Sequence, residues 1–392
     1  MSPHDAPAGS PVHAPALDRR RLIGRLAAAG FSAPVIGAIL AEMGAAQGAT
    51  PGATPTSAEV LASLGKDPRL IQHGTTTFET PVEAMTEFLT PNELFFIRSN
   101  GPVSVDIDPA EWRLSVTGLV QRELELTLDD LKAMTPRTIT AFLECSGNSR
   151  GRFGDDPQPV EGTRWGNGAV GNAEWTGVPV ADILDEAGVR EGVVDMVSQG
   201  GDFADMRRGL PIGIAYDPDV MLVWEMNGEP LPAPNGGPVR LLVPGWGGIA
   251  STKWVVGLEL IDRPFDGHFN VESYVFINED GIIERPVTVM GPKSVITSPT
   301  PGATLPAGPT TISGFAWSGY AGILKVEVSA DGGQNWAEAD IVQEAGPHSW
   351  VRFEYAWEAP AGEARLRSRA TDQRHISQPD EVPWNAKGYG MN

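Results

Sequence analysis

The sequence predicts an α+β protein of two folded domains, and three observations support this expectation. At roughly 150 residues per domain, a chain of 392 residues suffices for two domains and a short additional segment. With 46 glycines and 34 prolines, the chain is rich in turn formers and has few stretches that could form a long helix. From Pro292 onward, apolar and polar residues alternate as in antiparallel strands, which predicts an all-β second domain.

Residues 1–49 have the pattern of an export signal. Arg19, Arg20 and Arg21 precede the uncharged segment 26–40. This segment contains Pro34 and is shorter than the roughly 18 to 20 apolar residues that span a bilayer, so a signal-peptide core fits better than an anchor. The adjacent arginines indicate the twin-arginine route. We therefore expect a periplasmic or otherwise exported protein without a membrane span in its mature part. The alternative is an amphipathic surface helix with a basic start.

Residues 50–290 read as a mixed α+β domain. Strand-like runs occur at 112–117, 220–224 and 239–243, with glycine-bearing loops between them. A short helix is expected around 57–64 and another at 180–187, and a third begins after Thr127, which can cap it. Asp129 and Asp130 suit the positive N-terminal end of that third helix.

Residues 291–392 read as an immunoglobulin-like sandwich. The alternating runs 324–329, 350–355 and 364–370 predict antiparallel strands, and Asp331-Gly332-Gly333 predicts a tight turn. No cysteine pair marks this part as a true immunoglobulin domain. Its expected role is packing or assembly.

The charge balance excludes some classes of function. The chain has 29 Lys and Arg against 50 Asp and Glu, a formal net charge of −21. Such a chain repels phosphate backbones and anionic lipid surfaces, so nucleic-acid binding and membrane adhesion are disfavoured. An anionic substrate would have to meet a local cluster of arginines.

Cys145 is the single cysteine and cannot form an intramolecular disulfide. It ends the apolar run 139–144 and opens a polar loop that reaches Arg150, whose charge could favour the thiolate, the form that binds metals. No CxxC or HxxxH pair is present, which makes a structural zinc site improbable. A lone thiolate suggests a metal whose other ligands come from an organic cofactor. The plain alternative is a small buried apolar side chain.

Several motifs resemble the sulfite oxidase family of molybdenum enzymes, in the order in which that family has them. They are segments 142–150, 160–169, 175–180, 225–232 and 239–245, followed by Lys253-Trp254. Segments 314–319 and 331–336 are similar to the dimerisation domain of the same family. The resemblance covers nearly all of the chain after the export signal. It implies a molybdopterin-binding domain followed by the sandwich.

The resemblance implies a role for eight residues. Cys145 would ligate molybdenum together with the two dithiolene sulfurs of a single molybdopterin. Arg98, Arg150 and Trp165 match residues of the family's substrate pocket. Tyr274 follows Lys253 by 21 residues, the spacing of the family's active-site tyrosine. Asp202, Arg240 and Lys253 match residues that hold the pterin and its phosphate. Trp175 is expected to be an ordinary core aromatic.

Two positions depart from the family pattern, and both concern contacts with the cofactor. Asn100 and Asn235 stand where many members have a histidine. The chain also has neither a CxxCH motif nor a preceding cytochrome b5 segment, so no haem is expected in it. Electrons would then leave to a separate protein, such as a c-type cytochrome. A homodimer through residues 292–392 is expected.

Four functions are compatible with these residues. The first is a sulfite dehydrogenase that makes sulfate. The second is the molybdenum subunit of a Sox-type sulfur dehydrogenase, which oxidises sulfane sulfur carried on a partner protein. The third is an exported binding protein whose site is degenerate and empty. The fourth, a reductase of oxidised methionine, is disfavoured because such reductases lack the appended sandwich. Two arginines near the thiolate favour a small free oxyanion, that is, sulfite as substrate.

Overall fold

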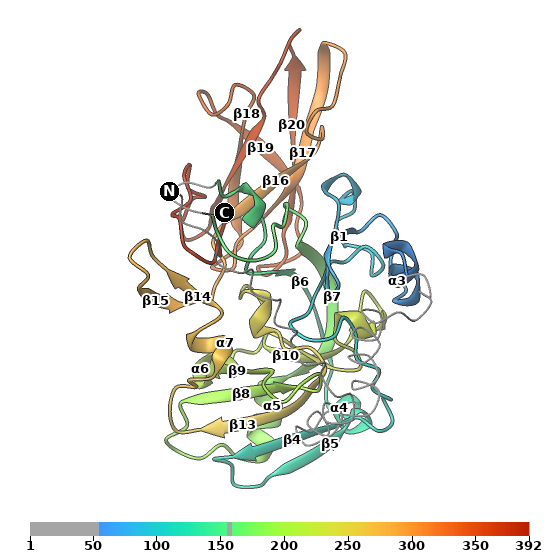
Figure 1. The fold of residues 1–392 in the computed structure, drawn as a ribbon, viewed down its shortest axis with the longest axis vertical. Coiled ribbons are helices and arrows are strands. Elements are labelled where there is room, and N and C mark those ends of the chain that lie inside the picture. Colours follow the sequence, from blue (N-terminus) through green and yellow to red (C-terminus); the bar gives the residue numbers. More distant parts are fainter. Residues whose placement is uncertain (1–54, 155–158, 392) are drawn as a thin grey trace, which may run out of the picture. The chain divides into compact units, whose positions relative to one another are not determined.

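Short strands are the commonest regular elements in residues 55–154 and 159–391, the part of the chain that the computed structural model describes (Figure 1). Residues Ser57–Asn392 form one compact unit. The helices in it are short, and the C-terminal part is all β, which confirms the expected fold class. The expected export signal, residues 1–49, lies outside the described residues. Within these residues, no helix is long and apolar enough to cross a membrane.

One five-stranded sheet lies in the lower part of Figure 1. Its strands, in spatial order, are β5 (Leu124–Thr127), β4 (Arg113–Gly118), β13 (Val255–Ile261), β8 (Asp195–Gly200) and β9 (Arg207–Pro211). Strands β4 and β13 are parallel, and the other neighbours are antiparallel. Leu114 and Val116 of β4 are buried while Ser115 between them is exposed, so one face of the strand packs on the core.

A second sheet carries the sole cysteine at the end of one of its strands. Its strands are β11 (Glu229–Pro230), β10 (Met221–Met226), β7 (Val170–Pro179) and β6 (Arg137–Glu144), with β12 (Arg240–Leu242) also paired to β10. All pairs are antiparallel, and β6 pairs with β7 from Arg137 to Glu144. Because the ladder continues to Glu144, the backbone immediately before Cys145 is held by the sheet.

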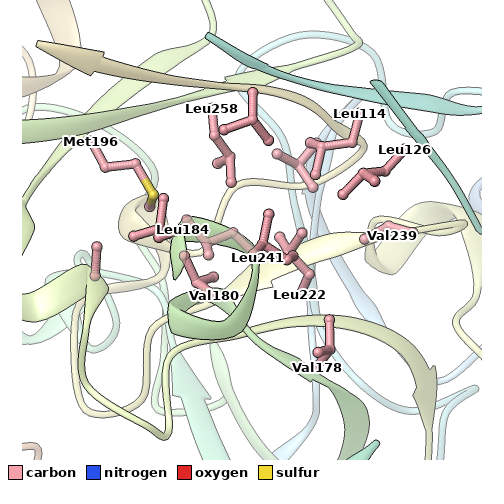
Figure 2. Packing of buried hydrophobic residues seen from close by; sticks show 14 of the residues in the cluster. Leu114, Leu126, Val178, Val180, Leu184, Met196, Leu222, Val239, Leu241 and Leu258 are labelled. Atoms are coloured by element: carbon pink, nitrogen blue, oxygen red, sulfur yellow. The ribbon is translucent and has the colours of Figure 1, made fainter. Parts of the chain in front are cut away.

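The largest hydrophobic core lies between these two sheets (Figure 2). Helix α5 (Val180–Ala187) buries Val180, Ile183, Leu184 and Ala187, which lie on one helical face, and ends at Gly188 in the left-handed conformation. Burial of each Val, Ile or Leu side chain among them stabilises the fold by roughly 1.5 to 3 kcal/mol. Helix α4 (Leu128–Ala133) begins with a capping box formed by Thr127 and Asp130, as expected.

Smaller elements surround this core and bring further residues to the site. They are α3 (Ser57–Ser63), β1 (Ile71–Gly74), β2 (Thr77–Glu79), η1 (Val82–Ala84), β3 (Ile97–Arg98), η2 (Arg150–Arg152), α6 (Ile212–Ala215), η3 (Ala233–Asn235), η4 (Gly248–Ala250), α7 (His268–Val271), β14 (Val275–Ile277) and β15 (Ile283–Pro286). Strand β3 ends at Arg98, and Tyr274 lies directly before β14.

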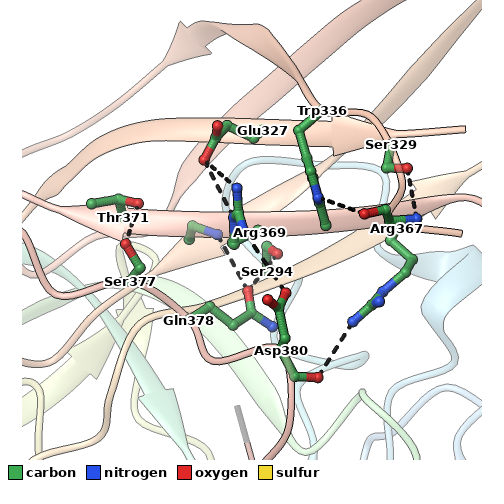
Figure 3. Close-up of polar contacts among 12 residues, drawn as sticks. Ser294, Glu327, Ser329, Trp336, Arg367, Arg369, Thr371, Ser377, Gln378 and Asp380 are labelled. Atoms are coloured by element: carbon green, nitrogen blue, oxygen red, sulfur yellow. Dashed lines mark hydrogen bonds and ion pairs between the residues drawn. The ribbon is translucent and has the colours of Figure 1, made fainter.

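The C-terminal strands form one six-stranded sheet that folds back on itself. In spatial order they are β16 (Lys293–Ser298), β17 (Gly308–Trp317), β20 (Val351–Ala359), β19 (Ala337–Gln343), β18 (Ile323–Ser329) and β21 (Arg367–Asp372). The two edge strands meet where Ser294 Oγ lies 2.9 Å from Ser368 Oγ. Figure 3 shows this region, in which Arg369 also pairs with Glu327 at 3.2 Å. Two faces thus enclose one core, as in the expected sandwich.

A buried contact joins the sandwich to the strand that carries the cysteine. Lys293 of β16 forms an ion pair with Glu144 at 3.1 Å, and the indole N–H of Trp317 donates to the same carboxylate at 2.9 Å. Glu144 also accepts from the Asn148 side chain at 2.9 Å. The sandwich therefore supports the residue that precedes Cys145 in the chain.

Candidate active site

Cys145 lies directly after β6, and only 7% of it is exposed. Its N–H donates to the Ala169 carbonyl at 2.9 Å, and its carbonyl accepts from the Asn148 N–H at 2.9 Å. The backbone is thus held on both sides, as expected for a strand end that opens into a polar loop. The residue lines two cavities, called cavity A and cavity B below.

Cavity A brings together Cys145 and all three residues that the sequence predicts for cofactor binding, Asp202, Arg240 and Lys253. Its empty volume, which includes open solvent, is about 680 Å³. Phe95, Phe96 and Trp254 contribute apolar surface to its wall.

Two cations give cavity A a positive lining, the buried Arg240 and the half-buried Lys253. Arg240 donates to the carbonyls of Asn235 at 2.7 Å and Ser251 at 2.9 Å, and burial lowers its pKa to about 9. Lys253 donates to Ser99 Oγ and to the Pro234 carbonyl, and burial followed by the nearby Arg240 charge lowers its pKa well below the usual value. Within the described residues, neither cation forms an ion pair with a carboxylate. An anionic group in cavity A would supply the missing negative charge.

Three polar atoms at cavity A are buried and have no hydrogen-bond partner in the described chain. They are Ser146 Oγ, Asp202 Oδ1 and Arg240 Nε. Burial also raises the pKa of the Asp202 carboxyl group. Buried polar groups are normally paired, so these atoms indicate a ligand that carries both donors and acceptors. A phosphate-bearing pterin has this chemistry, and the residues fit it.

A second buried lysine lies behind this lining. The ammonium group of Lys66 donates to Asn235 Oδ1 at 2.6 Å and to the carbonyls of Asn92 and Phe95. Burial lowers the pKa of Lys66 to about 7. Sequence reasoning missed Lys66 because 169 residues separate it from Asn235 and no local motif surrounds it.

Cavity B brings together the three residues that the sequence predicts for the substrate pocket and the predicted active-site tyrosine. Arg98, Arg150, Trp165 and Tyr274 all line it, together with Cys145. Its empty volume is about 600 Å³, including solvent space. Cys145, Arg98 and Tyr274 border both cavities. The predicted cofactor residues thus line cavity A, the predicted substrate residues line cavity B, and the two cavities share Cys145, Arg98 and Tyr274.

Arg150 is 6% exposed and is held by main-chain carbonyls. Its Nε donates to Lys387 at 2.8 Å and its Nη1 to Thr163 at 3.2 Å. Gly147 and Gly162 leave room for the guanidinium, since a Cβ on either would lie within 2.7 Å of it. Among the described residues, no carboxylate neutralises this cation, so its charge is available to an anion in cavity B.

Asn100 links two of the predicted residues. Its Oδ1 accepts from Arg98 Nη2 at 2.7 Å and from the Tyr274 hydroxyl at 3.1 Å. Arg98 also donates to the Ser99 carbonyl. The amide at one of the two positions that depart from the family pattern therefore holds Arg98 and Tyr274 together.

The two tryptophans behave differently. Trp165 is fully buried, and its indole N–H has no partner in the described chain although the residue lines cavity B. Trp175 donates to the Ala141 carbonyl at 3.0 Å and packs edge-on against Phe95, which confirms the expected core role.

Cavity B also has lining residues that were not predicted, among them Glu161, Lys387 and Tyr389. Lys387 and Tyr389 come from the end of the chain, and Glu161 comes from the loop before Trp165. Lys387 pairs with Glu161 at 2.7 Å and lowers the pKa of that carboxyl group. No sequence signal indicates that residues after the sandwich strands return to the site.

Comparisons with known proteins agree with this geometry. Residues 100–269 match the family model "Oxidoreductase molybdopterin binding domain", and residues 284–392 match "Mo-co oxidoreductase dimerisation domain". Sulfite oxidase of Gallus gallus is 34% identical over 346 residues, which cover 79% of this chain and 73% of that protein. The mitochondrial sulfite oxidase of Drosophila melanogaster is 33% identical over 80% of this chain.

A solved structure is also similar. The crystal structure of the sulfane dehydrogenase SoxCD from Paracoccus pantotrophus aligns with a TM-score of 0.73 and 34% identity, covering 85% of each chain. The chain spans only 60% of the length of the Drosophila relative and 62% of that of the human mitochondrial sulfite oxidase. The matched domains and relatives place the chain in the sulfite oxidase family of molybdopterin-dependent oxidoreductases.

Proposed function

We propose that the protein oxidises sulfite to sulfate at a molybdenum centre and passes the electrons to an external acceptor, such as a c-type cytochrome. One observation carries the proposal. Cys145 lies where cavity A, lined by the cations Arg240 and Lys253, meets cavity B, which two arginines line. The names of the relatives, sulfite oxidases, support the choice of substrate.

In this proposal, cavity A holds the cofactor, a molybdenum bound to one molybdopterin. The Cys145 thiolate would ligate the metal, a role suited to a soft ligand. Arg240 and Lys253 would neutralise the phosphate, and Asp202 would accept from or donate to the pterin. When bound, the cofactor supplies an oxygen atom to the substrate sulfur and takes up two electrons.

The residues of cavity B bind and orient the anion. Arg98 and Arg150 offer charge-assisted hydrogen bonds to sulfite oxygens, and Trp165 offers a buried N–H. Tyr274, held by Asn100, offers its hydroxyl group at the border of the two cavities. Overall, sulfite and water give sulfate, two protons and two electrons, and two one-electron acceptors remove the electrons.

A second substrate class has support from a specific observation. The similar crystal structure is that of a sulfane dehydrogenase. Cavity B also has three aromatic residues in its lining, Trp165, Tyr274 and Tyr389, beside its charged residues. The alternative is therefore oxidation of sulfane sulfur carried on a partner protein.

Export and assembly complete the proposal. Residues 1–49 would direct the protein to the periplasm, or out of the cytoplasm more generally, by the twin-arginine route, which carries folded proteins. The match of residues 284–392 to a dimerisation domain supports a homodimer.

The test is steady-state reduction of ferricytochrome c by the purified, molybdenum-loaded protein. With sulfite, we expect rapid turnover that the Cys145→Ser variant lacks. A parallel assay uses glutathione persulfide as a sulfane donor. No turnover with sulfite despite stoichiometric molybdenum contradicts the proposal, and turnover with the persulfide alone establishes the alternative.

A further inference from the structure

The end of the described chain forms a wall of cavity B. Four hydrogen bonds hold it there. Ala386 accepts from the Glu161 N–H and donates to the Ile277 carbonyl, both at 3.0 Å. Gly390 N–H donates to the Ser146 carbonyl at 3.1 Å, and Arg150 Nε donates to the Lys387 carbonyl at 2.8 Å. The segment therefore bridges separate loops, each of which lines or adjoins the site.

The sequence of this segment suits its path. The Asn385 side chain donates to the Tyr389 carbonyl at 2.9 Å and accepts from the Tyr389 N–H at 3.0 Å, which closes a tight turn. Gly388 within the turn has a φ of +57°, and a Cβ there would lie 2.8 Å from the Arg150 side chain. The turn thus lies directly against Arg150.

Tyr389 contacts two of the predicted substrate residues at once. Its ring stacks on Tyr274, with centroids 5.3 Å apart and planes at 15°. The Arg150 guanidinium carbon lies 4.9 Å from the centroid of the same ring. The phenol hydroxyl donates to the Ser273 carbonyl at 3.2 Å, and burial raises the pKa of Tyr389, so the ring stays neutral.

These contacts leave one side of Arg150 free for a ligand. Nε and Nη1 donate to carbonyls, whereas Nη2 forms no hydrogen bond with the described residues. A guanidinium held by an aromatic face and two carbonyls loses little further freedom when an anion binds.

We propose that Tyr389 is a positioning residue of the oxyanion site, which holds Arg150 and Tyr274 in the arrangement that binds the sulfur oxyanion. The proposal rests on the function proposed above. It assigns the C-terminal segment to the active site, in addition to the packing and assembly expected of the C-terminal domain.

Two substitutions separate the parts of the Tyr389 side chain. Tyr389→Phe keeps the aromatic face and removes the hydroxyl, whereas Tyr389→Leu keeps apolar bulk and removes the face. Tyr320→Leu is the matched control, because Tyr320 also packs under an arginine, Arg374 at 5.6 Å, but lines neither cavity. For each molybdenum-loaded variant, sulfate affinity is measured by calorimetry, and KM and kcat are measured with sulfite.

We expect Tyr389→Leu to weaken sulfate binding and raise KM at least tenfold while kcat changes less than threefold. In Tyr389→Phe and Tyr320→Leu, sulfate affinity and KM should stay within twofold of the wild-type values. Three results would overturn the proposal. Tyr389→Leu could bind sulfate with an affinity within twofold of the wild type, or Tyr389→Phe could lose as much sulfate affinity as Tyr389→Leu. The third is that the wild type binds no sulfate.

The calorimetric readout is independent of turnover. If the wild type binds sulfate in a Tyr389-dependent way but does not oxidise sulfite, the proposed function is wrong and the positioning role stands. If circular dichroism shows that Tyr389→Leu is unfolded, Tyr389→Met replaces it under the same criterion.

Discussion

At the scale of single residues, the site consists of cations that the protein itself does not neutralise. Arg150 and Arg240 are buried and Lys253 is half-buried. Within the described residues each donates hydrogen bonds to neutral oxygens. The chain as a whole carries a formal charge of −21, so acidic partners for these cations are abundant in the sequence. Asp202 lies near Lys253, but no carboxylate of the described residues forms a direct ion pair with any of the three cations, which indicates sites for exogenous anions.

Arg150→Met should raise KM for sulfite about 10- to 100-fold, because a hydrogen bond to a charged group contributes roughly 1.5 to 3 kcal/mol. Steady-state kinetics of the loaded enzyme measures the effect. Arg122→Met is the control, since Arg122 pairs with Glu186 and is 63% exposed. An unchanged KM in the Arg150 variant would remove Arg150 from the substrate site.

Lys66 should make the cofactor-free protein more stable at high pH. Its pKa is about 7 in the folded chain and about 10.4 in the unfolded chain, so the unfolded state binds more protons between these values. The free energy of unfolding therefore rises as the pH increases from 7 toward 10. This contribution of Lys66 is lost again as the pH falls through 7.

Thermal unfolding of cofactor-free protein at pH 7 and pH 9 tests this expectation. The rise in Tm should be smaller in Lys66→Met than in the wild type and unchanged in Lys132→Met, which removes an exposed lysine of α4. Equal rises in Tm for Lys66→Met and Lys132→Met would show that Lys66 does not titrate in this range.

The candidate site could be predicted from the sequence where residues lie within short motifs. The eight predicted residues all line cavity A or cavity B. Four residues of the site were not predicted: Lys66, Glu161, Lys387 and Tyr389. Each contacts residues that lie from tens to more than 160 positions away in the sequence, so these contacts depend on how separate loops pack. Asn100 was recognised as a departure from the family pattern, but its link between Arg98 and Tyr274 is visible only in three dimensions.

At the scale of elements, the sandwich supports the strand that presents Cys145. Glu144 at the end of β6 is fully buried and is bonded to Lys293 of β16 and Trp317 of β17. Burial lowers the pKa of Lys293, while the nearby Glu144 charge opposes that effect. The pair is charged, buried and hydrogen-bonded, so loss of one partner leaves the other uncompensated.

Lys293→Met should lower the free energy of unfolding by about 3 to 5 kcal/mol, and the double variant with Glu144→Gln should recover part of it. Denaturant titration of each purified variant measures the change. Lys325→Met is the control, since Lys325 pairs with Glu327 on the same sheet but is 36% exposed, and exposed pairs contribute about 0 to 1 kcal/mol. A loss below 1 kcal/mol for Lys293→Met would contradict the account.

Elements with strong local signals were predicted well. Helix α5 spans the predicted 180–187, and Thr127 caps α4 as expected. The predicted runs 220–224 and 324–329 overlap β10 and β18. The order of strands in the sheets and the meeting of β16 with β21 could not be predicted, because pairing between distant strands leaves no local pattern.

At the scale of the whole molecule, the proposed export route gives a direct prediction. Replacing Arg19, Arg20 and Arg21 by lysines keeps the charge but removes the guanidinium pair that the route reads. We expect the variant to accumulate in the cytoplasm and the wild type in the exported fraction, measured by fractionation and immunoblotting. Export of the lysine variant at the wild-type level would contradict the twin-arginine route.

The central claim is that Cys145 holds molybdenum where cavity A meets cavity B. Molybdenum K-edge X-ray absorption of the loaded protein tests it most directly, by counting sulfur neighbours of the metal. The account predicts one sulfur ligand more in the wild type than in Cys145→Ser, the wild-type set being the thiolate and the two dithiolene sulfurs. An identical sulfur count in the two proteins, both fully loaded, would contradict it.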